Sequence, residues 1–330
     1  MTVIHVFELS PDGNEGWTEN ALYRFTGGTD GGSPNFAGLT LDSAGNLYGT
    51  ASLGGANGYG VVFELSPEGT SWTETVVYSF CSQENCTDGA SPRNGLVMDK
   101  AGNLYGTAFY GPNSAGGIFE LSPSGGAWME RIIYVFDGLV YSGLTTDSVG
   151  DLFGVTSSTV FELSPNGDGN WNPSVIHTFA GPPKDGSAPE GTLALDQAGN
   201  LYGTTTGGGS RNLGTVYEVV ASKNGWKEKV LHNFRGGKDG QDPWTGVALD
   251  NSGNIYGTSA QGGQWNAGTV YELQPQAGRA WYKEMVLWSF DSSDGNLPEG
   301  GLVLDSAGDL YGTTSGGGAY SWGVVFKLVP

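Results

Sequence analysis

A block of about 53 residues recurs six times along the chain, and this repeat limits the possible folds more than any other feature. The phrase GLTLDSAGNLYGT at 38–50 returns near 95–107, 143–155, 192–204, 246–258 and 301–313. A second phrase of the type VFEL follows each copy and also occurs once near the N-terminus. Self-similarity at this period predicts stacked copies of one small structural unit.

Each unit contains four short runs with the alternation of a β-strand, and no segment has helical periodicity. In the first complete unit these runs are 39–42, 47–52, 61–65 and 72–80. Glycine, with 58 residues, also disfavours helices at a cost of about 1 kcal/mol per position. We predict an all-β fold: a six-bladed β-propeller with four antiparallel strands per blade, forming one domain over residues 1–330. A β-helix is a less favoured alternative, because its coils are shorter.

The two ends of the chain hold unequal numbers of strands. The VFEL-type strand occurs seven times, whereas the other strand types occur six times. We predict that 301–329 supply three strands of the last blade and that 18–25 supply its fourth, leaving 3–9 as a spare strand. Closing the ring with N- and C-terminal strands in this way removes exposed sheet edges.

Charge and composition exclude several classes of protein. Acidic residues outnumber basic ones 34 to 14, for a net charge of -20, so binding of nucleic acid is not expected. No apolar run approaches the ~20 residues of a membrane span, and the N-terminus has no signal-peptide pattern. Cys81 and Cys86 lie in one polar loop; a small disulfide, and hence an oxidising compartment, is favoured over two free thiols.

The phrase LYGT…GG…GTVYEL, clearest at 201–218 and 255–273, resembles the GloVer tandem repeat of bacterial surface proteins. The resemblance covers nearly the whole chain and implies a propeller-like exported protein. Members of that family typically carry a signal peptide and a C-terminal anchor. The unit DSAGNLY is also similar to NHL-type propeller repeats, which bears on the fold alone. No catalytic residue carries over from either resemblance.

Positions shared by all blades are most simply explained by the blade itself. The aspartates of the repeated turns and of the Asp–Gly pairs are interpreted as stabilising turns, with a calcium site in each blade as the less favoured alternative. The Trp after each VFEL phrase is interpreted as structural. Histidine is rare, and His177 and His232 fall in fourth strands. We therefore expect no metal site and no cofactor.

Residues that differ between blades fall in two sets of loops on one face, where propellers usually bind ligands. Three of the four tryptophans outside the repeat position, Trp244, Trp265 and Trp322, fall in these loops on blades five and six, together with Tyr320. The short interval from Phe119 to Phe161 removes the long loops of blade three. We predict a groove with an aromatic wall and a low lip, suited to sugar rings. The candidate binding residues are Asn35, Tyr59, Arg93, Tyr110, Tyr141, Arg211, Trp244, Trp265, Tyr320 and Trp322.

The favoured function is an extracellular or cell-surface propeller that binds a polysaccharide or oligosaccharide, with cleavage as its enzymatic form. If the protein is catalytic, Glu190 and Glu299 are the candidate acid and base of an inverting glycoside hydrolase, although a solvated rim is the favoured interpretation of both residues. Arg93 is suited to a uronate carboxylate. A polysaccharide lyase with Tyr141 as base is a weaker possibility. The alternative function is a noncatalytic scaffold or adhesion module that docks a surface protein.

Overall fold

The computed structural model describes residues 4–330 apart from 14–15, 35–37, 113–114, 224 and 277–281. The chain forms two compact units, Met1–Leu144 and Thr145–Pro330. Their described residues are mostly strands, with short 3-10 helices at η1 (Glu84–Cys86) and η3 (Gly237–Asp239). The predicted fold class, a six-bladed β-propeller of four-stranded antiparallel blades, is confirmed. The single domain over 1–330 stays a prediction.

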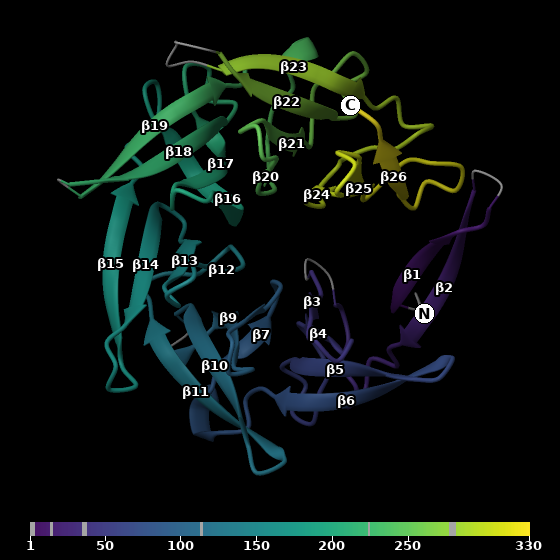
Figure 1. Cartoon of the computed structure of the whole chain (residues 1–330), viewed down its shortest axis with the longest axis vertical. Helices are drawn as coiled ribbons and strands as arrows, with labels where there is room; N and C mark the ends of the chain where they lie inside the picture. The colour runs from purple at the N-terminus through teal and green to yellow at the C-terminus, as the bar shows by residue number, and fades with distance from the viewer. Residues whose placement is uncertain (1–3, 14–15, 35–37, 113–114, 224, 277–281) are drawn as a thin grey trace. The chain divides into compact units, whose positions relative to one another are not determined.

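The first unit contains three antiparallel sheets, which Figure 1 labels in purple and blue. A two-stranded sheet pairs β1 (His5–Pro11) with β2 (Trp17–Arg24). The next sheet has the order β3-β4-β5-β6, with bounds Thr40–Leu41, Leu47–Ala51, Val61–Glu68 and Ser71–Ser79. The third has the order β11-β10-β9-β7, with β8 also paired to β9, and its bounds in chain order are Ala90–Pro92, Val97–Met98, Leu104–Tyr110, Gly117–Ser124 and Ala127–Val135.

The second unit contains four antiparallel sheets (Figure 1). Sheet β12-β13-β14-β15 has bounds Thr145–Thr146, Leu152–Val155, Thr159–Pro165 and Trp171–Thr178. Sheet β16-β17-β18-β19 has bounds Gly186–Leu195, Leu201–Gly208, Thr215–Ser222 and Gly225–Asn233. Sheet β20-β21-β22-β23 has bounds Ala248–Leu249, Ile255–Ser259, Thr269–Pro275 and Tyr282–Ser289, and sheet β24-β25-β26 has bounds Val303–Leu304, Leu310–Thr314 and Val324–Leu328.

Strand β1 is not the spare strand that the sequence analysis expected. It pairs with β2 along its whole length, from His5 opposite Arg24 to Pro11 opposite Trp17. The same hairpin of a VFEL-type strand and its successor recurs in the five sheets that contain β5–β6, β10–β11, β14–β15, β18–β19 and β22–β23. Closing such a short local loop costs little entropy. The pairing of 18–25 with the last blade, and ring closure by N- and C-terminal strands, stay predictions.

The repeated aromatic residues form the core between neighbouring sheets of one unit. The Phe that ends one repeat packs edge-to-face on the aromatic residue of the next VFEL phrase, an arrangement that aromatic rings favour. Phe80 and Phe119 have ring centroids 5.0 Å apart, and Phe179 and Tyr217 are 4.9 Å apart. Trp128 packs in the same way on Tyr48 at 6.1 Å, which confirms a structural role for the repeated Trp at this position.

The glycine of the LYGT phrase is explained by these rings. A Cβ atom built on Gly106 would lie 2.4 Å from Cζ of Phe119 and 2.7 Å from Cδ2 of Leu96. Both neighbours are buried, so neither has space to move away. The glycine therefore allows β9 to pass directly over the aromatic ring of its neighbour β10.

Candidate functional site

Several candidate residues, including Arg93, Trp244 and Glu299, directly follow a proline at a sharp bend of the backbone. The residue before the proline is not glycine, yet it has a positive φ angle at Ser33, Ser91, Ala188, Asp242 and Leu297. The proline packs against a glycine of the preceding blade's loop. A Cβ atom on Gly60, Gly214 or Gly268 would lie 2.6, 2.6 or 2.4 Å from Cδ of Pro92, Pro243 or Pro298, respectively. We call Ser91–Arg93, Asp242–Trp244 and Leu297–Glu299 the proline corners.

In the first unit, the corner at Arg93 lies beside the loop that carries Tyr59. The backbone N–H of Ser91 donates a 2.8 Å hydrogen bond to the carbonyl oxygen of Tyr59. The next polar residue of the corner, Asn94, donates from its side chain to Oγ1 of Thr107 at 3.1 Å. These bonds fix the backbone on both sides of Arg93, so its guanidinium is held over a defined part of the sheet.

Arg93 belongs to a compact group of aromatic side chains, which we call the Arg93 cluster (Arg93, Phe109, Tyr110 and Tyr141). Its guanidinium carbon lies 3.8 Å from the ring centroid of Phe109, in a cation–π contact. Phe109 contacts Tyr110 at 4.8 Å and Tyr141 at 5.8 Å, both edge-to-face. The structure therefore brings together three residues that the sequence analysis proposed for binding, with Phe109 as the support between them.

The cluster presents polar and aromatic surface to solvent. Tyr110 is 44% exposed and Tyr141 is 42% exposed, and the neighbouring Tyr59 is 49% exposed. Within the described part of the chain, Arg93 forms no ion pair. Its guanidinium keeps donors free for an external acceptor, while Phe109 holds its plane. Asn35, the remaining candidate of this unit, lies outside the described residues.

In the second unit, Glu190 lies next to the corner that carries Trp244. Oγ1 of Thr204 donates to the carbonyl oxygen of Thr245 at 2.7 Å and to that of Glu190 at 3.5 Å. Burial raises the pKa of Glu190, and the negative charge of Asp242 raises it further. A half-buried carboxyl group beside a second carboxylate has the electrostatics of a proton donor. The sequence analysis proposed Glu190 and Trp244 but did not identify Asp242.

Arg211 and Trp265 lie on loops beside the proline corners. The backbone of Asp242 donates to Leu213, in the loop of Arg211, and that of Leu297 donates to Ala267, in the loop of Trp265; both bonds are 3.1 Å. Arg211 donates to the carbonyl oxygen of Arg235 at 2.9 Å. The pairing of Glu190 with Glu299 as acid and base stays a prediction. Tyr320 and Trp322 are 86% and 84% exposed.

The repeated turn aspartates act as the sequence analysis favoured. Oδ1 of Asp42 accepts the backbone N–H groups of Ala44 and Asn46 at 2.8 Å, and Oδ2 accepts the side-chain amide of Asn46 at 2.9 Å. The equivalent bonds recur at Asp99, Asp196 and Asp250. These carboxylates therefore close turns. The predicted disulfide between Cys81 and Cys86 is also present.

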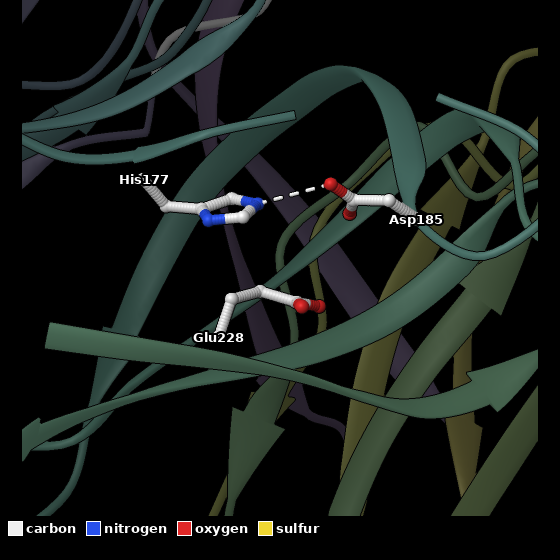
Figure 2. Close-up of side chains that lie close together, drawn as sticks. All are labelled: His177, Asp185 and Glu228. Carbon is white, nitrogen blue, oxygen red and sulfur yellow. Dashed lines mark hydrogen bonds and ion pairs between the residues drawn. The ribbon is translucent and has the colours of Figure 1, made fainter. Parts of the chain in front are cut away.

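One group of side chains in the described residues could hold a metal ion. Nitrogen and oxygen atoms of His177, Asp185 and Glu228 all lie within 4.8 Å of one another (Figure 2). The sequence analysis placed His177 in a fourth strand, which is confirmed as β15. It did not identify the group, because Glu228 comes from a different blade and no spacing in the sequence brings the three residues together.

Comparison with known proteins agrees with the repeat architecture. The Gloeobacter/Verrucomicrobia repeat matches residues 5–159 and 141–330, which together cover almost the whole chain. The chain belongs to the Gloeobacter/Verrucomicrobia repeat family. The resemblance to the GloVer repeat is thereby confirmed. No curated protein matches this Gloeobacter/Verrucomicrobia repeat protein.

Several solved structures share the fold of this repeat protein. A provisionally assigned glucose dehydrogenase from Thermus thermophilus has a TM-score of 0.56 at 15% identity, with 91% of this chain and 97% of that chain covered. The PQQ-bound aldose sugar dehydrogenase from Streptomyces coelicolor has a TM-score of 0.51 at 11% identity, with 91% and 96% covered. At these identities the likeness concerns the fold alone. Among the described residues, no helix is long and apolar enough to cross a membrane.

Proposed function

We propose that this protein is an extracellular propeller that binds an acidic saccharide through the Arg93 cluster. The observation that carries the proposal is the arrangement of Arg93 on Phe109 beside two half-exposed tyrosines. Tyrosine rings offer flat apolar faces for the C–H face of a sugar and hydroxyl groups for its edge. The guanidinium offers paired N–H donors for a carboxylate, the group that distinguishes a uronate from a neutral sugar.

The strongly negative protein charge does not prevent this interaction. The net charge of -20 comes largely from aspartates and glutamates repeated in every blade. At physiological ionic strength their effect is screened over about 8 Å, whereas the guanidinium would act in direct contact with a bound carboxylate. The same charge disfavours nucleic acid, whose binding requires many basic groups along a phosphate backbone.

Similar structures support the choice of a saccharide, and two further observations support an extracellular location. The similar structures include proteins described as a glucose dehydrogenase and an aldose sugar dehydrogenase, so related propellers are associated with sugars. The disulfide between Cys81 and Cys86 and membership of the repeat family support a location outside the cytoplasm. Neither comparison identifies the saccharide, and the proposal of an acidic one depends on Arg93.

Cleavage of a saccharide bound within the second unit is a separate, enzymatic form of the proposed function, and Glu190 is its candidate acid. Because its pKa is raised, the Glu190 carboxyl group more readily keeps the proton that a general acid donates to the glycosidic oxygen. Glu299 remains the proposed base, and Asp242 is a second carboxylate close enough to affect Glu190. A glycoside hydrolase predicts that E190Q abolishes release of reducing ends and preserves binding. Equal release by E190Q and the wild type would exclude this role for Glu190.

A glycan array with matched variants tests the binding proposal. Wild-type protein should bind uronate-containing glycans, and R93Q and Y110A should lose most of that signal. E68Q is a suitable control, because Glu68 is exposed at the end of β5 and belongs to no candidate site. Binding that is absent from the wild type, or unchanged in R93Q, would refute the proposal.

Docking of a protein partner is the second candidate function, and Tyr320 and Trp322 favour it. Both side chains are almost fully exposed on the loop between β25 and β26, as expected for anchors that become buried in an interface. A scaffold of this kind predicts that Y320A with W322A abolishes capture of a surface protein. Under the same hypothesis, R93Q leaves capture intact.

A further inference from the structure

We propose that His177, Asp185 and Glu228 form a binding site for a divalent transition-metal ion such as Zn²⁺, which links two neighbouring blades of the second unit. The three residues come from β15, from the loop before β16 and from β19, and their side chains converge on one space (Figure 2). Strands β15 and β19 contact each other directly. A metal ion here would therefore add a link between two sheets that are already joined by side-chain packing and by the hydrogen bond from Oγ1 of Thr145 to the carbonyl oxygen of Leu193.

The chemistry of the donors indicates the class of metal. One imidazole nitrogen and two carboxylate oxygens suit Zn²⁺, which accepts mixed nitrogen and oxygen ligands and commonly keeps a fourth position for water. Ca²⁺ prefers six to eight oxygen ligands, so a set that includes histidine is unfavourable for it. This site shares Asp185, the aspartate of an Asp–Gly pair, with the calcium sites considered in the sequence analysis, but its histidine ligand gives it a different chemistry.

The geometry is already close to that of a zinc site. Nε2 of His177 lies 3.2 Å from Oδ2 of Asp185. In a tetrahedral zinc site two such ligand atoms are about 3.3–3.5 Å apart, which follows from bonds of ~2.0–2.1 Å. The widest separation in the group, within 4.8 Å, requires a small movement of the flexible Glu228 side chain.

Among the described residues, a buried carboxyl oxygen without a hydrogen-bond partner occurs at Glu228 and also at the equivalent Glu74, Glu130 and Glu284. Glu228 differs from Glu74 and Glu130 because an imidazole, and not a phenol, lies beside it. Oε1 of Glu228 is inaccessible to solvent and has no hydrogen-bond partner. Leaving a carboxyl oxygen buried without a partner costs free energy, so such an atom requires an explanation. A bound cation would supply the missing partner and neutralise both carboxylates.

The same position in other blades provides a natural comparison. Tyr23, Asp30 and Glu74 occupy it in one blade pair, and Tyr78, Asp88 and Glu130 occupy it in another. There the tyrosine hydroxyl donates to the aspartate, at 3.1 Å for Tyr23 and 2.8 Å for Tyr78. A neutral phenol at this position replaces the imidazole ligand.

The next blade of the second unit keeps the metal-binding residue types. His232 lies 3.1 Å from Asp239, but among the described residues the group that brings three ligand atoms within 4.8 Å of one another is His177, Asp185 and Glu228. Oε1 of Glu284 is likewise inaccessible to solvent and has no hydrogen-bond partner. His232 therefore provides a matched control for a variant at His177.

Calorimetric titration of the full chain with ZnCl₂, after treatment with a chelator, tests the proposal. Wild-type protein should bind zinc and H177Y should lose one equivalent, whereas H232Y should keep that equivalent. H177Y installs the residue that other blades carry, so it should fold; circular dichroism and the melting temperature in chelator verify this. E228Q should weaken the same equivalent by at least about tenfold, because it removes a charged ligand.

Three results would overturn the metal site: no zinc binding by the wild type, an unchanged zinc stoichiometry in H177Y, or equal binding of CaCl₂ and ZnCl₂. As a further readout, zinc should raise the melting temperature of the wild type by a few degrees and have a smaller effect on H177Y. The proposal is independent of the saccharide site, which uses other residues.

Discussion

Replacing Glu130 by glutamine should alter how the stability of the protein depends on pH. Glu130 lies on β11, and its Oε1 atom is inaccessible to solvent and has no hydrogen-bond partner among the described residues, while a side-chain hydrogen bond with Tyr78 partly opposes the rise of its pKa. Burial is the main cause that raises its pKa from 4.5 to about 8, and the nearby charge of Asp88 adds to it. The folded protein therefore retains a proton on Glu130 that the unfolded chain loses above about pH 4.5.

The sign and size of the effect follow from this difference. A carboxyl group with a raised folded-state pKa gives its full stability below the unfolded pKa and loses it as the pH rises toward 8. The shift corresponds to an upper limit of about 5 kcal/mol. Because the side chain is only partly buried, solvent screening reduces the expected effect to roughly 1–3 kcal/mol.

Urea denaturation of the wild type and E130Q at pH 5 and pH 8 measures this effect. The wild type should lose roughly 1–3 kcal/mol more free energy of unfolding than E130Q between the two pH values. For each protein, the free energy of unfolding at pH 8 is subtracted from that at pH 5, which cancels any effect of the glutamine side chain that does not depend on pH. E68Q, at an exposed position of the same unit, should follow the wild type. Parallel pH dependence in the wild type and E130Q would refute the role of Glu130.

Two further predictions concern the backbone. G106A should destabilise the protein by about 1–3 kcal/mol in urea denaturation, because the added Cβ would collide with the ring of Phe119 and the side chain of Leu96. G138A is the control and should have little effect, because a Cβ at that position meets nothing within 4 Å. A188G should stabilise the protein by up to about 1 kcal/mol in thermal denaturation, because Ala188 has a φ of 52°, a backbone conformation that glycine adopts more easily than alanine. A loss of stability in A188G would show that the backbone at Ala188 is not strained.

The sequence predicted the blades well because each blade depends on local pattern. The strand alternation, the turn at Asp42 and the aromatic residues such as Phe80 and Phe119 recur in every unit and require no long-range information. Pairing at the N-terminus was harder to predict, since the choice of partner for β2 depends on distant strands. The local hairpin with β1 is what the structure contains.

The candidate sites were predictable only in part. Arg93, Tyr110 and Tyr141 were identified because they interrupt the repeat at loop positions. Their contact through Phe109 depends on side-chain directions that the sequence does not specify. Asp242 and Glu228 were missed for a different reason. Each acts on a residue of a neighbouring blade, and nothing in the linear spacing indicates that contact.

The central claim is that Arg93 recognises the carboxylate of a sugar bound on its aromatic neighbours. Calorimetric titration with an oligogalacturonate and with its methyl-esterified form tests this claim directly, since the two ligands differ in the carboxylate charge. The wild type should prefer the acidic form by about tenfold or more, equivalent to ~1.4 kcal/mol, and R93Q should bind both forms equally. An undiminished preference in R93Q, or equal affinities in the wild type, would contradict the claim.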